Sequence, residues 1–177
     1  MGLLSDLFRS KPKAADVNGY LVWKFGMSKE QVKNAGFGPY TDVNSTGGCE
    51  TFSAPFNGRP AQVSFIFNND QLSRIQVWAY AGAEKEGAVE GFTEIYKYMK
   101  TNLGSMESPA MKVNEFKDSD SFKNFSRMLM LLPSADPVRK IQLRATHVNP
   151  QNVNVFAPMI EAPGQGCFSF LYFDRKA

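Results

Sequence analysis

The fold is decided by residues 61–80, which read AQVSFIFNNDQLSRIQVWAY. Apolar and polar side chains alternate on both sides of the Asn68-Asn69-Asp70 turn, a pattern typical of two antiparallel strands. Residues 52–56 alternate in the same way and are followed by the Asn57-Gly58 turn signal. We therefore expect a meander of antiparallel strands between residues 40 and 80.

Helical spacing replaces this alternation elsewhere. Ser28 and Gln31 have the spacing of a capping box, which predicts the start of a short helix. From residue 84 to 103 the apolar side chains fall on one stripe, which predicts a longer helix. Residues 122–132 fit either a short helix or a strand, and the sequence leaves both open.

The C-terminal part returns to strand spacing. Residues 140–148, 153–159 and 167–173 each favour a strand, and turn-forming residues separate them. The expected class is therefore α+β, an antiparallel β-sheet with two or three α-helices packed on one face. We expect residues 1–16 to form an N-terminal arm and linker, and residues 17–177 to form a single domain.

Composition and charge narrow the classes of function. Of the 177 residues, 43% are hydrophobic and 21% are charged, which is typical of a globular domain. Twenty basic against 17 acidic residues leave a net charge of +3, too small for a dedicated nucleic-acid surface. No apolar run could span a membrane and no secretory signal is recognisable, so we expect a cytoplasmic protein.

The N-terminal arm has its own pattern. Residues 3–9 place Leu3, Leu4, Leu7 and Phe8 on one side of a short helix. One interpretation is an arm that contacts a membrane or a partner. The other is a frayed terminus, or a helix that rests on the domain, because so short a helix is marginal on its own.

One segment resembles a known superfamily. Phe25-Gly-Met-Ser-Lys-Glu-Gln-Val32, then Phe37-Gly-Pro39 and the hairpin Phe67–Leu72, is similar to the β-lactamase-inhibitory proteins and the small lipoproteins of outer-membrane assembly. The resemblance covers about residues 20–80. It implies two short helices on one face of an antiparallel sheet, and proteins that mostly bind other proteins as inhibitors, assembly factors or immunity factors. The chain lacks the lipid-attachment cysteine of the lipoproteins, and its second half does not repeat the helix-start motif.

Few residues are suited to catalysis. His147, the single histidine, shares strand parity with Leu143 and Ala145, so we expect it to face the core as a structural residue. Cys167 is expected to be a buried thiol at the start of a strand, and Cys49 an exposed thiol in a flexible loop. Whether the two cysteines pair stays open. One histidine and two remote cysteines make no metal site, so we expect no catalytic residue, no metal and no cofactor.

Strand parity divides the sheet into two faces. Ile75, Val77 and Ala79 form the apolar face that should meet the helices, and the opposite face is polar and aromatic. Trp, Tyr and Arg are common binding hot spots because each combines a large rigid area with a polar group. The expected partner-binding residues are Gln62, Ile66, Arg74, Gln76, Trp78, Tyr80, Arg144 and Phe156. Alternatively, the loop at residues 105–121, the N-terminal arm or a second copy of the chain covers this face.

These features predict a non-catalytic protein-binding module. Its most specific version is a bacterial inhibitor or immunity protein that neutralises a protein partner, such as a toxin or an enzyme. Two alternatives stay open: an envelope- or secretion-associated assembly factor with a membrane-contacting arm, and a small enzyme of unrecognised chemistry. The sequence does not set the oligomeric state.

Overall fold

The computed structural model describes residues 14–133, 136 and 138–176, so the segment at residues 3–9 lies outside the described residues. The helices are α1 (Lys29–Asn34), α2 (Lys85–Asn102) and α3 (Ser119–Leu131), with a 3-10 helix η1 (Val113–Glu115) before α3. The strands of the main sheet are β4 (Tyr40–Val43), β5 (Gly48–Phe56), β6 (Arg59–Asn68), β7 (Gln71–Gly82), β8 (Met106–Glu107), β9 (Arg139–Ala145), β11 (Val153–Ala162) and β12 (Gly166–Arg175). Short pairs are made by β1 (Ala15–Asp16) with β10 (Val148–Asn149), and by β2 (Gly19–Tyr20) with β3 (Trp23–Lys24).

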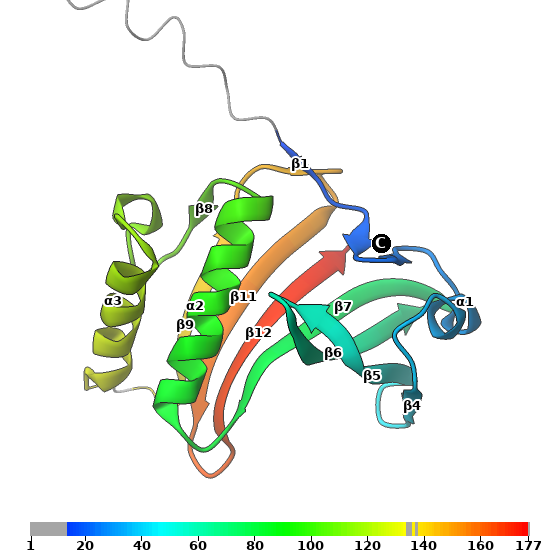
Figure 1. The fold of residues 1–177 in the computed structure, drawn as a ribbon, viewed down its shortest axis with the longest axis horizontal. Coiled ribbons are helices and arrows are strands. Elements are labelled where there is room, and N and C mark those ends of the chain that lie inside the picture. Colours follow the sequence, from blue (N-terminus) through cyan, green and yellow to red (C-terminus); the bar gives the residue numbers. More distant parts are fainter. Residues whose placement is uncertain (1–13, 134–135, 137, 177) are drawn as a thin grey trace, which may run out of the picture.

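The eight main strands form one antiparallel sheet in the order β4-β5-β6-β7-β12-β11-β9-β8. The sheet is strongly bent, and α2 lies across the face shown in Figure 1. This architecture confirms the expected α+β class. None of the described helices has the length and apolar character that crossing a membrane requires.

Helix α2 supplies the layer that buries the sheet. Its expected apolar stripe is confirmed, since Phe92, Ile95 and Met99 are fully buried. They pack on β7, β12 and β11, where Val77 and Leu171 are also fully buried. Removing apolar surface from water stabilises the fold by about 25 cal/mol per Å², so this interface holds helix and sheet together.

Residues 122–132, which the sequence left open, belong to helix α3. The Asp118 side chain accepts a hydrogen bond from the Ser121 amide at 2.8 Å, and Ser121 Oγ accepts one from the Asp118 amide at 3.2 Å. This capping box starts a helix there. Helix α3 packs mainly on α2, where the Phe122 ring stacks on Tyr96 with 4.0 Å between ring centroids. The sheet therefore has one helical layer, with α3 beside it.

Two tight hairpins join β5, β6 and β7, as the turn signals predict. Asn57 and Gly58 have φ angles of 47° and 77°, and Asn69 and Asp70 have φ angles of 50° and 58°. Asparagine, aspartate and glycine tolerate this left-handed backbone better than other residues. Asn57 Nδ2 donates a hydrogen bond of 2.9 Å to the Glu94 carbonyl, so the tip of the first hairpin contacts α2.

The N-terminal described residues belong to the folded body. Ala15 and Asp16, which the sequence assigned to the linker, pair in parallel with Val148 and Asn149. Trp23 is fully buried, and its Nε1 donates a hydrogen bond of 3.1 Å to the Tyr40 hydroxyl.

Candidate partner-binding face

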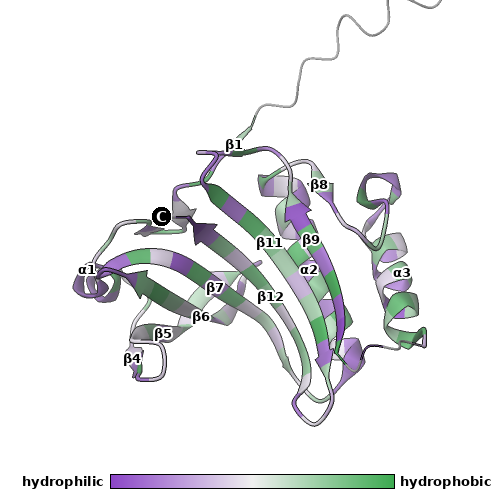
Figure 2. Cartoon of the chain, turned by 180° about the vertical axis from the view of Figure 1, so that it is seen from behind, coloured by the Kyte–Doolittle hydropathy of each residue, from purple (hydrophilic) through white to green (hydrophobic). Residues whose placement is uncertain are grey.

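The sheet has a second face, here called the open face, whose side chains point away from α2. It lies opposite the buried Val77, Val155 and Leu171. Figure 2 shows this side of the sheet, and none of the described helices crosses it. Its members include Gln62, Ser64 and Ile66 from β6, Arg74, Gln76 and Trp78 from β7, Phe168, Phe170, Tyr172 and Asp174 from β12, Asn154 and Phe156 from β11, and Lys140, Gln142 and Arg144 from β9. Seven of the eight expected partner-binding residues therefore lie on this face.

An aromatic ridge, made of Trp78, Phe156, Phe168, Phe170 and Tyr172, crosses the middle of the open face. Phe156 stacks on Tyr172 with 4.8 Å between ring centroids, and Phe168 stacks on Phe170 at 5.8 Å. Trp78 meets Phe170 edge to face at 4.6 Å. Its neighbours bury Phe170 to 7% exposure, while the other four rings are half-buried. The ridge is a continuous, partly solvent-accessible apolar surface.

Polar groups hold the indole at one end of the ridge. Trp78 Nε1 donates a hydrogen bond of 3.1 Å to Ser64 Oγ. Ser64 Oγ donates to the Glu50 carboxylate at 3.5 Å, and Gln62 Nε2 donates to the same oxygen at 2.8 Å. Because each polar group has a partner, the orientation of the indole is fixed before any ligand arrives.

An ion pair lies beside the ridge. Arg74 donates two hydrogen bonds to the Asp174 carboxylate, at 3.2 and 3.0 Å, and its guanidinium lies 5.8 Å from the centroid of the Tyr172 ring. The hydrogen bonds from Arg74 to Asp174 raise the pKa of Arg74, and burial raises the pKa of Tyr172. At neutral pH, Arg74 is therefore charged but neutralised by its partner, and Tyr172 is uncharged.

The β9 side of the open face carries positive charge that is not neutralised. Arg144 donates to the neutral Asn154 side chain at 3.2 Å. Within the described part of the chain, neither Arg144 nor Lys140 has a carboxylate at ion-pair distance. A shallow depression of about 250 Å³ here is lined by Gln142, Arg144, Asn154, Phe156 and Lys176. It places Arg144 and Lys176 next to the Phe156 ring.

Tyr80 does not lie on the open face, so its expected placement on the side away from the helices is wrong. On β12, Ser169 is opposite Tyr80, but the next residue, Phe170, is opposite Trp78, so Ala79 is an extra residue on β7. This β-bulge reverses the parity of the strand after Trp78. The Tyr80 ring consequently lies beneath α2, where its hydroxyl accepts a hydrogen bond of 3.2 Å from the Glu84 amide.

Glycine in α2 makes room for this arrangement. A Cβ atom at Gly91 would overlap Ser169 Oγ and lie only 2.9 Å from the Cβ of Tyr80. A Cβ at Gly87 would overlap the Tyr80 ring. The two glycines let α2 approach the sheet closely at the bulge.

We expect Gly91→Ala to destabilise the fold by about 1–3 kcal/mol through overpacking, despite the better helix propensity of alanine, worth about 1 kcal/mol. Adding Ser169→Ala removes the overlapping hydroxyl, so the double variant should recover part of the loss. Denaturant unfolding of the two single variants and the double variant measures the coupling. Strictly additive losses would contradict the packing that the structure gives to Ser169 and Gly91.

The sequence prediction missed three members of the ridge, Phe168, Phe170 and Tyr172. They alternate with Cys167, Ser169, Leu171 and Phe173, so period-two parity groups them on one face. Since both sets are largely apolar, parity alone does not say which set meets the helix. Which set meets the helix is decided by the position of β12 at the centre of the sheet.

The loop at residues 105–121 does not cover the open face. It contains β8 and η1, and Val113 shares a cavity with Tyr96 and Lys100 of α2. Phe116 packs edge to face on Phe122 of α3 at 5.4 Å. The loop therefore lies on the helical side of the sheet, and that alternative is wrong.

The groups considered for catalysis do not form a site. Cys49 was expected in an exposed loop, but it is fully buried in β5, where burial raises its pKa. His147 was expected to face the core, but β9 ends at Ala145 and His147 is exposed. Its Nδ1 lies 2.8 Å from Thr146 Oγ1. Cys167 is buried, as expected, and its Sγ contacts the Ala83 carbonyl at 3.9 Å.

The described residues therefore contain no paired nucleophile and base among these groups. Cys49 and Cys167 are both free thiols, and burial also raises the pKa of Cys167, which disfavours a reactive thiolate. Among the residues that the structure describes, no group of three or more His, Cys, Asp and Glu side chains could hold a metal ion.

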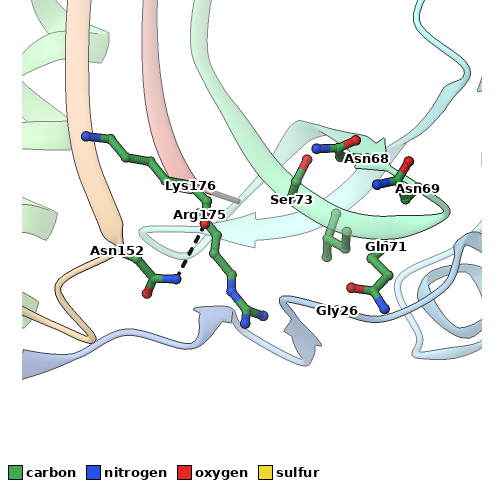
Figure 3. A pocket seen from close by; sticks show the side chains of 9 residues that line it. Gly26, Asn68, Asn69, Gln71, Ser73, Asn152, Arg175 and Lys176 are labelled. Carbon is green, nitrogen blue, oxygen red and sulfur yellow. Dashed lines mark hydrogen bonds between the residues drawn. The ribbon is translucent and has the colours of Figure 1, made fainter.

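A polar recess of about 210 Å³ lies where the β6–β7 hairpin meets the end of β12 (Figure 3). Amides and two cations surround it, and Asn152 Nδ2 donates to the Lys176 carbonyl at 3.4 Å. Arg175 points toward the segment at Gly26, whereas the Lys176 side chain points the other way. The lining residues include no Asp, Glu, His or Cys, so the recess supplies no carboxylate, imidazole or thiol for catalysis.

Comparison with protein-family models, with curated proteins and with solved structures finds no match to this chain.

Proposed function

We propose that this chain is a non-catalytic protein-binding module that holds a protein partner on the open face. The observation that carries the proposal is the aromatic ridge on a sheet face that no described helix crosses. Tyrosine and tryptophan dominate binding energies because they bring large, rigid areas together with a polar group. The bacterial inhibitor or immunity role is the most specific version of this proposal, with the cytoplasm as its proposed compartment.

The charges on the open face indicate the chemistry of the partner. Arg74 is neutralised by Asp174, whereas Arg144 and Lys176, which line the depression, have no carboxylate at ion-pair distance in the described part of the chain. Opposite charges across an interface steer association and fix its register. The partner would place an apolar patch on the ridge and an acidic side chain in the depression beside Phe156.

A charge reversal tests this proposal. We expect Arg144→Glu to weaken binding at least roughly tenfold, about 1.4 kcal/mol, because it places like charges together in the interface. Lys112→Glu changes the net charge equally on an 82% exposed side chain away from the open face, and it should have little effect. Affinity of each purified variant for the partner that co-purifies with the tagged full chain, measured at two salt concentrations, gives the comparison.

Equal weakening by both reversals would show that only the net charge matters, and would contradict the proposed interface. Recovery of nucleic acid in place of a protein partner would contradict the proposed class of ligand.

A further inference from the structure

The sheet contains a gap in its strand pairing between β6 and β7. The two strands pair from Asn68 with Gln71 as far as Gln62 with Trp78, and the pairing stops there. The first residues of β6, Arg59–Ala61, pair only with β5, and the hairpin that they form turns toward α2. β7 continues past Trp78 to Gly82, paired with β12 alone.

The last four residues of β7 therefore have one free edge. In an antiparallel sheet, alternate residues direct their N–H and C=O groups to opposite neighbours. Residues 79–82 have β12 on one side, and no other strand pairs with them in the described part of the chain. Figure 1 shows the lower part of β7 beside β12 with no strand on its other side.

A groove of about 270 Å³ lies at the start of this edge. Pro60 and Ala61 form one wall, Trp78, Ala79 and Tyr80 line the side formed by β7, and α2 closes it with Gly87 and Gly91. Three charged residues also line it. Glu90 pairs with Lys123 at 3.0 Å and Glu94 pairs with Lys97 at 2.7 Å, while Arg59 interacts with Glu94, whose pKa is lowered by Lys97 and further by Arg59. The groove therefore suits an uncharged, apolar side chain.

This edge lacks two of the features that block strand addition, charge and proline, although it begins at the β-bulge at Ala79. Natural edge strands are blocked by charged residues, by proline, by bulges or by a covering helix or loop. Residues 79–82 are Ala, Tyr, Ala and Gly, without a charge or a proline. By contrast, the edge strand β4 carries Asp42, which pairs with Lys29 at 2.7 Å and Lys33 at 2.9 Å.

We propose that the edge of β7 at residues 79–82 accepts an extended peptide segment of a partner protein, which adds a strand to the sheet in the position that β6 vacates. Backbone hydrogen bonds would supply the affinity, and the groove would select an apolar side chain at one position of the segment. Two copies of this chain do not fit edge to edge here, because each edge lies between its own β5–β6 hairpin and α2. The site goes beyond the open face, since backbone pairing carries it rather than the aromatic ridge.

The test uses short random peptides displayed on phage and selected on the full chain. The expected result is at least one uncharged peptide whose synthetic form slows hydrogen exchange at alternate residues within 79–82, those whose amides face away from β12, and leaves the amides of β4 unchanged. Blocking a peptide N–H by methylation should weaken binding by roughly threefold to tenfold at alternate peptide positions only, because a strand directs every second amide to its neighbour.

Two neighbouring substitutions provide a matched control. Ala61→Arg puts a long side chain at the wall of the groove and should abolish peptide binding, while Gln62→Arg, on the opposite face of the same strand, should retain it. A melting curve checks that both variants fold. Failure to select any peptide, protection that maps elsewhere, or methylation effects without alternation would each overturn the proposal. Arg144→Glu should not change peptide binding. Failure of the proposed binding at the open face can therefore be distinguished from failure of peptide binding at β7.

Discussion

Phe122→Ala is expected to lower the free energy of unfolding by about 3–5 kcal/mol. The Phe122 ring is fully buried and stacks on Tyr96 with an interplanar angle of 6°. It also packs on Phe92 at 5.5 Å and on Phe116 at 5.4 Å between ring centroids. Removing it leaves a cavity at the contact through which α3 is attached to α2. Denaturant unfolding followed by circular dichroism measures the loss.

Phe125→Ala is the matched control, because Phe125 is on the same helix and is only half-buried against Phe116. Its loss should be clearly smaller. A decrease below about 1 kcal/mol for Phe122→Ala, against the usual cost of such a cavity, would contradict the role of this ring in attaching α3.

Trp78→Ala is expected to weaken partner binding by at least roughly thirtyfold, about 2 kcal/mol, as removal of a hot spot does. The side chain forms one end of the aromatic ridge, and its contacts within the chain include the Phe170 ring and Ser64 Oγ. Because the indole is half-buried, the variant should also lose stability, but by less than it loses in binding free energy. Titration of the partner and a thermal melt, both on the purified variant, separate the two effects.

Leu131→Ala is the control for this experiment. Leu131 is 68% exposed on α3, away from the open face, so its removal should leave binding unchanged. If Trp78→Ala instead unfolds the chain and binding is retained by its folded fraction, the indole is a core residue and not a binding residue.

The elements that could be predicted from sequence are those whose signals are local. The capping box at Ser28 is present with both of its hydrogen bonds, and the turns at Asn57-Gly58 and Asn69-Asp70 join hairpins. The stripe along residues 84–103 is buried as expected. Each of these signals acts over a few residues, so tertiary contacts do not override it.

The failures have non-local causes. The bulge that turns Tyr80 beneath α2 depends on Ser169 and on glycines of the helix, which lie far from it in the sequence. β9 ends before His147 because the Thr146 amide donates to the Ser105 carbonyl, and the Ala15 amide donates to the His147 carbonyl. An apolar pattern over a few consecutive residues carries no information about these contacts.

Cys49 shows a further limit of local patterns. Gly47-Gly48 read as a flexible loop, but β5 begins at Gly48 and Cys49 is opposite Phe65 on β6. A Cβ at Gly48 would overlap the Phe65 carbonyl, so this glycine permits a close strand approach. Glycine can permit a close approach between strands as well as form a turn. The sequence does not distinguish these two roles.

Hydroxyl-radical footprinting of the full chain, alone and with its co-purified partner, tests most directly whether the open face binds a protein. We expect the partner to lower the oxidation of Trp78, Phe156 and Tyr172. Met128 and Leu131 of α3, which are 46% and 68% exposed, should be oxidised equally in both samples. Protection of the α3 side chains with unchanged oxidation of the ridge would contradict the proposed function, and so would the absence of any partner.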